Sequence, residues 1–190
     1  MKRERLCTLG LLAFFVSMEK AVADSYTVDP RHTFPSFEVS HLGFSTQRGR
    51  FNHTEGKIQL DPANQRGRVE ISIDTASIDT GLEELEERLR KEDFFDVGHH
   101  PKIVYRAEKV RFTGDRPVAV EGEITLRGRT RPLSLNVEHF HCGLNPIYLR
   151  QVCGADATGT LRRSDFGMSA FLPLVGDEVR LHIQVEAFKD

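Results

Sequence analysis

Residues 153–188 read CGADATGTLRRSDFGMSAFLPLVGDEVRLHIQVEAF, and the end of this stretch decides the fold. In it, Val179, Leu181, Ile183, Val185 and Ala187 alternate with Arg180, His182, Gln184, Glu186 and Phe188. Alternation with a period of two over ten residues is typical of a β-strand with one apolar face. We therefore expect a strand here, preceded by a polar turn at residues 162–165, with partner strands supplied by the rest of the chain.

Most of the remaining chain also has strand patterns. The expected strands lie at residues 26–28, 34–42, 44–60, 68–74, 102–112, 118–126, 132–142 and 152–162. About eight strands joined by short turns predict an all-β fold, either an antiparallel sandwich or a closed barrel. The strand length, the glycines within strands and the sequential hairpins favour an eight-stranded antiparallel up-and-down barrel.

One helix is expected, over about residues 81–91. Thr80 and Glu83 have the spacing of a capping box, and Leu82, Leu85 and Leu89 form a narrow apolar stripe at helical spacing. So thin a stripe suits a helix laid across one end of the sheet.

The first 23 residues have the pattern of a secretory signal peptide. Basic residues are followed by an apolar run over residues 6–16 and by Ala21-Val22-Ala23, which predicts cleavage after Ala23. The run is too short for a membrane-spanning helix, which needs about twenty residues. The leader carries four basic and two acidic residues, so the 167 remaining residues form a single domain, 24–190, with a formal charge of −4. This charge gives no reason to expect nucleic-acid binding.

Two cysteines, Cys142 and Cys153, remain after the leader. An even number of cysteines in an exported chain favours a disulfide, and the turn at Asn145-Pro146 lies between the two. A metal-binding thiol pair is the alternative, but no quartet of ligands accompanies it.

The apolar strand faces would line the interior of a barrel, which at eight strands is just wide enough for a packed core or one small ligand. An apolar interior favours a hydrophobic ligand. The side chains expected to line the bore are Phe37, Val39, Phe51, Val69, Ile71, Ile73, Ile124, Leu126, Leu135, Leu181 and Ile183.

Segments along the whole chain after residue 23 resemble the YceI-like family of polyisoprenoid-binding proteins. These segments are YTVDP (26–30) with His32, FEVSHLG (37–43), GRF (49–51), Gly56, Asp61, LR (89–90), DFFDV (93–97) with Pro101, Gly122, LRGRTRP (126–132), CGAD (153–156), RSDFG (163–167) and GDEV (176–179). The resemblance implies a lipocalin-like eight-stranded barrel that holds an elongated amphiphile, such as a polyisoprenoid or a quinone-like lipid. It implies binding or transport in the periplasm, without established catalysis and without a cofactor.

Histidines and arginines are the other candidate site residues. His32 and His41 lie near the first strands, where a histidine is usually hydrogen-bonded in the core or at the rim, or else contacts a ligand headgroup. His139 and His141 share a strand face, but no third metal ligand is evident, and no metal site is predicted. The arginines at 127, 129 and 131 are expected in a solvated turn, and those at 162 and 163 in a brace with Asp165.

No nucleophile elbow, zinc-protease motif, P-loop or nucleotide-binding glycine motif occurs in the sequence. In line with what the resemblance implies, we expect a binding protein. The alternatives are an enzyme or redox accessory that acts on a lipid or quinone through His32 or His41, and a barrel with a packed core that serves as an interaction module. A homodimer is compatible with the sequence.

Overall fold

The computed structural model describes residues 23–190, so the predicted signal peptide lies almost entirely outside the described residues. Twelve β and α elements follow along the chain: β1 (Asp24–Val28), β2 (Phe34–His41), β3 (Ser45–Phe51), β4 (Thr54–Asp61), β5 (Arg66–Asp74), β6 (Ile78–Asp79), α1 (Glu83–Leu89), β7 (Lys102–Thr113), β8 (Arg116–Leu126), β9 (Arg129–Asn145), β10 (Arg150–Arg162) and β11 (Val175–Lys189). Short 3-10 turns lie at Pro62–Asn64, Thr75–Ser77 and Arg163–Phe166.

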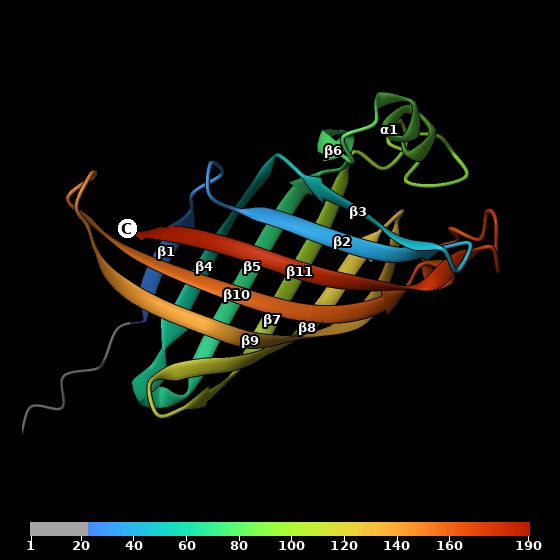
Figure 1. Cartoon of the computed structure of the whole chain (residues 1–190). Helices are drawn as coiled ribbons and strands as arrows, with labels where there is room; N and C mark the ends of the chain where they lie inside the picture. The colour runs from blue at the N-terminus through green and yellow to red at the C-terminus, as the bar shows by residue number, and fades with distance from the viewer. Residues whose placement is uncertain (1–22) are drawn as a thin grey trace, which may run out of the picture.

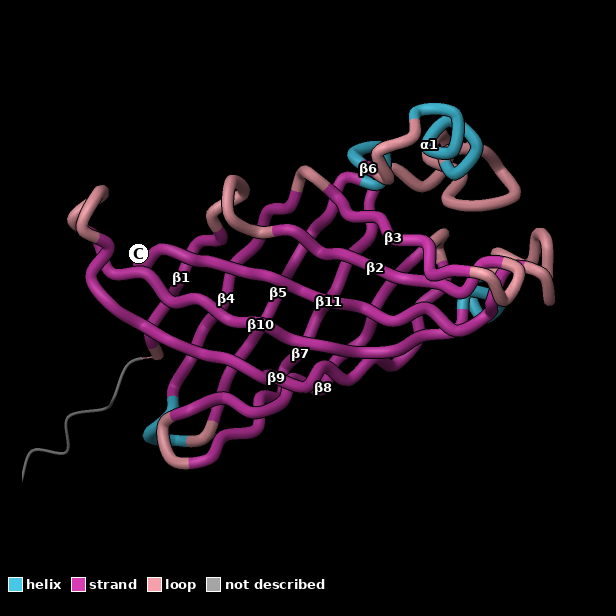
Figure 2. The backbone as a smooth tube through the Cα atoms, viewed as in Figure 1, coloured by secondary structure: helices cyan, strands magenta, loops and turns pink. Residues whose placement is uncertain are grey.

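The strands close into an antiparallel barrel with eight positions around its wall (Figures 1 and 2). Three positions are each shared by two successive strands: β1 with β2, β3 with β4, and β5 with β6. The other five positions are β7 to β11 in chain order, and β11 closes the ring by pairing with both β1 and β2. The predicted eight-stranded antiparallel barrel is therefore confirmed, and the sandwich is excluded.

The alternation in the last strand orients its side chains as expected. Val179, Leu181 and Ile183 face the interior, while the side chains of Arg180 and His182 are more than half exposed. Residues paired across neighbouring strands point to the same face of the sheet. The apolar residues of β10, β11 and β2 therefore form one interior surface.

One helix, α1, lies at one end of the barrel, on the long connection from β6 to β7 (Figure 1). It is shorter than predicted and begins at Glu83, because Gly81 has a φ of +75° and Leu82 is still extended. The predicted capping box is wrong in its partners: the carboxylate of Glu86, not of Glu83, accepts the Thr80 backbone N–H, at 2.9 Å. Within residues 23–190, no helix is both long and apolar enough to cross a bilayer.

The disulfide prediction is confirmed, since Cys142 and Cys153 are bonded to each other. They lie directly opposite each other on β9 and β10, close to the turn that joins these strands. This covalent bond clips the β9–β10 hairpin at the end of the barrel that lies away from α1 (Figure 1).

Candidate ligand-binding cavity

An apolar cavity of about 270 Å³ lies inside the barrel. Side chains from all eight wall positions line it. It is therefore an internal cavity of the barrel and not a local depression in the surface. The interior is therefore not completely packed, which argues against the packed-core alternative.

All eleven apolar side chains that the sequence placed in the bore lie on the cavity wall. They are Phe37, Val39, Phe51, Val69, Ile71, Ile73, Ile124, Leu126, Leu135, Leu181 and Ile183. Their contact with a ligand remains a prediction.

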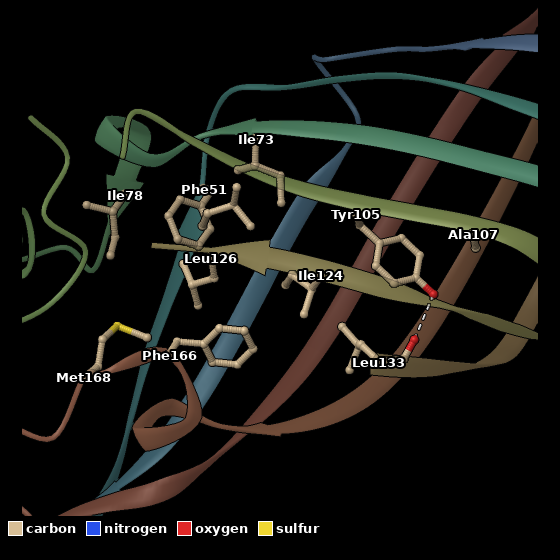
Figure 3. Packing of buried hydrophobic residues seen from close by; sticks show 11 residues of the cluster. Phe51, Ile73, Ile78, Tyr105, Ala107, Ile124, Leu126, Leu133, Phe166 and Met168 are labelled. Carbon is tan, nitrogen blue, oxygen red and sulfur yellow. Dashed lines mark hydrogen bonds between the residues drawn. The ribbon is translucent and has the colours of Figure 1, made fainter. Parts of the chain in front are cut away.

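Buried residues pack around the cavity in two clusters. One includes Phe51, Ile124 and Phe166 (Figure 3), with Leu89 of α1 and Phe95 packed against it, and the other contains Tyr26, Leu60 and Ala187. The cavity wall includes residues of both clusters, so the cavity extends between the two ends of the barrel.

Tyr105 is a polar residue in this apolar wall, and its hydroxyl is satisfied by the barrel itself. The hydroxyl lies within hydrogen-bond distance of two backbone carbonyl oxygens, that of Val120 at 3.2 Å and that of Leu133 at 3.1 Å. Figure 3 shows the bond to Leu133. Burial raises the pKa of the phenol, so it stays neutral at physiological pH. Tyr105 therefore adds no charge to the cavity.

The connection that carries α1 supplies three further wall residues: Leu89, Phe94 and Phe95. The Phe95 ring meets the Phe51 ring edge-on, with centroids 5.5 Å apart. Phe94 and Phe95 are not among the side chains that the sequence placed in the bore. Their position could not be read from strand periodicity, because they lie outside any strand.

Neither His32 nor His41 lies on the cavity wall. The Nδ1 atom of His32 is 2.8 Å from the carboxylate of the buried Asp29, and its side chain is almost half exposed. His41 is the last residue of β2 and is paired with Val175. A role of either ring at the rim or toward a headgroup remains a prediction.

Asp29 is a buried carboxylate whose ionised form is stabilised locally. Burial opposes ionisation, but hydrogen bonds from His32 and from the Arg31 side chain and backbone outweigh it and lower the pKa of Asp29. His32 thus belongs to a structural brace at the break between β1 and β2.

Arg163 is braced differently from the sequence prediction. Its side chain is buried, with 5% exposed, and donates to the carbonyls of Gly176, Met168 and Val175. The predicted partner Asp165 is wrong, because Asp177 is the acidic residue that accepts from Ser164 and pairs with Arg162. Asp177 lies twelve positions after Asp165. It comes close to Arg162 and Ser164 only because the β10–β11 connection folds back.

Arg127 does not lie in a solvated turn, which corrects that prediction. Its guanidinium donates to the backbone carbonyls of Gly167 and Glu92, each at 2.8 Å, and so connects the β8–β9 turn to two other connections at this end.

In the described part of the chain, no three or more potential ligands gather into a metal site, and His139 and His141 border a shallow outer surface pocket.

The model of the YceI-like domain matches residues 26–187, nearly all of the described chain. The chain belongs to the YceI-like family. YceI-like relatives of similar length include a UPF0312 protein of Pseudomonas paraeruginosa, 31% identical with all of both chains covered. A UPF0312 protein of Vibrio cholerae is 30% identical, over 96% of this chain and 97% of its own.

Solved structures share the YceI-like fold. Burkholderia cenocepacia BcnA aligns with a TM-score of 0.71 at 21% identity, covering 84% of this chain and 98% of that one. A domain from Saccharophagus degradans, described as a polyisoprenoid binding domain implicated in plant cell wall breakdown, aligns with a TM-score of 0.65 at 16% identity over 87% and 98% of the two chains. At these identities the likeness concerns the fold alone.

Proposed function

We propose that this YceI-like barrel binds an elongated amphiphilic lipid, a polyisoprenoid or quinone-like molecule, and carries it through the periplasm. The observation that carries the proposal is the apolar cavity, to which every wall position of the barrel contributes. The description of the Saccharophagus degradans domain as polyisoprenoid-binding supports the same ligand class. The signal-peptide pattern before residue 24 supports the periplasmic location.

Affinity would come from burial of the lipid tail. Each methylene removed from water contributes about 0.8 kcal/mol, from which the cost of ordering the chain is subtracted. The volume of about 270 Å³ lies near the lower limit of cavities that hold small molecules, roughly 300 Å³. A tail would therefore fill the bore, and the polar end would stay outside the apolar wall.

The enzymatic alternative, with His32 or His41 as acid or base, has no support in the placement of these residues. A catalytic imidazole must come within hydrogen-bond distance of the reacting group. Among residues 23–190, no histidine lies on the cavity wall.

Native mass spectrometry of protein purified from the periplasm tests the proposal. We expect co-purified lipid, and uptake of an added prenyl lipid or quinone after stripping. Leu181→Trp puts a larger side chain on the cavity wall and should reduce uptake at least tenfold. His182→Trp places the same ring on the outer face of the same strand and serves as the matched control.

A barrel that is reproducibly empty and takes up neither class of lipid would contradict the proposal. Equal loss of uptake in the Leu181 and His182 variants would also count against it, since the effect would then not come from the bore.

A further inference from the structure

The β9–β10 hairpin ends in an exposed apolar tip, which consists of Leu144, Ile147, Tyr148 and Leu149. Ile147 is 80% exposed, Leu149 75% and Leu144 63%. The tip projects at the end of the barrel opposite α1 (Figure 1). Three large aliphatic side chains in water at one turn are unfavourable unless a partner covers them.

The tip is held in a defined shape. The side chain of Asn145 accepts the backbone N–H groups of Ile147 and Tyr148, at 2.9 and 3.1 Å. The Cys142–Cys153 disulfide closes the hairpin behind it, and Leu149 has a φ of +51°, a conformation that a bulky residue adopts at a cost. The hairpin thus presents apolar side chains on a stiff support.

Cations and aromatic rings surround the base of the tip. The Arg31 guanidinium lies over the Tyr148 ring, and the Arg150 guanidinium over the Phe188 ring, at 5.0 and 4.7 Å from the centroids. Arg31 is paired with Asp29, whereas within residues 23–190 no carboxylate lies within 4 Å of Arg150. Apolar tips followed by tyrosine and arginine match the layers of a bilayer surface, from acyl chains to anionic headgroups.

The start of the domain lies at the same end. Arg150 donates to the carbonyl of Lys189, and Lys189 pairs with Asp24 at 2.6 Å. The chain before Ala23 contains the apolar run of the predicted leader. While a leader is still attached, this end of the barrel is therefore the end nearest the membrane.

We propose that the hairpin tip docks the barrel onto a lipid bilayer that carries anionic headgroups. A second copy of the chain fits less well, because a stable protein interface needs about 800 Å² per partner and the four tip side chains cannot supply it. Shallow insertion into a bilayer needs only the tip itself. This inference goes beyond the proposed cargo and does not depend on what the cavity binds.

Sedimentation with vesicles of phosphatidylglycerol and phosphatidylethanolamine tests the docking. The I147S/L149N variant replaces two apolar tip residues, and asparagine accepts the left-handed backbone at position 149. We expect the partition coefficient of this variant onto the vesicles to fall at least tenfold. The midpoint of its urea unfolding should be unchanged or shifted to a higher urea concentration. The matched control, F44S/L174S, removes two exposed apolar residues elsewhere, 89% and 60% exposed, and should bind within twofold of the unaltered protein.

Arg150→Gln should weaken binding to these vesicles about fivefold and leave binding to neutral phosphatidylcholine vesicles unchanged.

Vesicle binding by the folded I147S/L149N variant equal to that of the unaltered protein would overturn the proposal, as would an unaltered protein that does not bind vesicles. A dimer that becomes monomeric in this variant would instead assign the tip to self-association and overturn it too. Leu181→Trp should still bind vesicles, so failure of the cargo proposal can be told apart from failure of the docking proposal.

Discussion

At the scale of single residues, buried polar side chains hold the connections of the barrel in place. Arg163 is the clearest example, because its guanidinium joins the carbonyl of Met168 in the β10–β11 connection to those of Val175 and Gly176 at the start of β11. Loss of the guanidinium would remove a charge-assisted hydrogen bond from each carbonyl, which is costly away from solvent. The residue therefore holds the start of β11 in place, and it also lies on the cavity wall.

We predict that Arg163→Met lowers the free energy of unfolding by about 3 kcal/mol, because the freed carbonyls lose charge-assisted hydrogen bonds. Urea unfolding followed by circular dichroism measures the change. Arg162→Met is the control, since its side chain is 71% exposed and its ion pair with Asp177 should contribute less than about 1 kcal/mol. Equal effects of the two substitutions would show that the carbonyl brace does not stabilise the fold.

Asp29 leads to a prediction about pH. Its pKa is lower in the folded protein than in the unfolded chain, so its contribution is present above about pH 4, the unfolded value, and is lost as the pH falls through the folded value. Asp29→Asn should therefore cost about 2 kcal/mol at pH 7, as expected for charge-assisted hydrogen bonds. The difference from the unaltered protein should shrink progressively below pH 4.

Urea titrations between pH 2 and 7 measure this dependence. Asp115→Asn, in the exposed turn between β7 and β8, serves as the control and should have little effect at any pH. A cost of Asp29→Asn that is the same at pH 2.5 and pH 7 would contradict the assignment of its effect to the carboxylate charge.

At the scale of elements, the disulfide stabilises the longest hairpin of the barrel. Cys142 and Cys153 are separated by 11 positions and close a short loop around the turn. In the chain-entropy account, a loop of this size contributes about 3 kcal/mol by restricting the unfolded chain. The bond also holds the opposing residues of β9 and β10 in register near the turn.

C142S/C153S should lower the free energy of unfolding by about 3 kcal/mol, and reduction of the unaltered protein should have the same effect. Urea unfolding with and without dithiothreitol measures both. The double variant itself should not respond to dithiothreitol. A stability that is insensitive to loss of the bond would mean that the hairpin is already fully ordered by its strand pairing.

The short helix offers a second prediction at this scale. The Glu86 carboxylate accepts the Thr80 backbone N–H and also pairs with Arg90, so Glu86→Ala should cost about 1 kcal/mol. Glu87→Ala removes a neighbouring exposed carboxylate and should stay within about 0.5 kcal/mol of the unaltered protein. Thermal unfolding of the two variants separates these outcomes.

At the scale of the whole molecule, the cavity couples ligand binding to stability. A ligand that binds only the folded barrel stabilises it by mass action, by about 2.7 kcal/mol when its free concentration is a hundred times Kd. Removal of co-purified lipid should therefore lower Tm, and adding a prenyl lipid or quinone back should restore it. Leu181→Trp should show no such shift, whereas His182→Trp should behave like the unaltered protein.

Strand periodicity determined much of this architecture. The alternation in β11 and in the other strands identified the side chains that face inward, and all eleven expected in the bore lie on the cavity wall. This succeeded because a strand orients successive side chains to opposite faces whatever its partners are. The paired cysteines were also predictable, from their even number in a chain with an export signal.

Only the tertiary structure decided the contacts made by irregular segments. Phe94 and Phe95 enter the cavity wall, Arg163 binds carbonyls in place of Asp165, and Arg127 spans two other connections, because loops bring together residues that no local period relates. The same holds for the base of the hairpin, where Arg150 and Asp24 come to the same end of the barrel because both contact Lys189 of β11. Local backbone geometry determined which way each strand residue faces, and closure of the barrel determined what each connection touches.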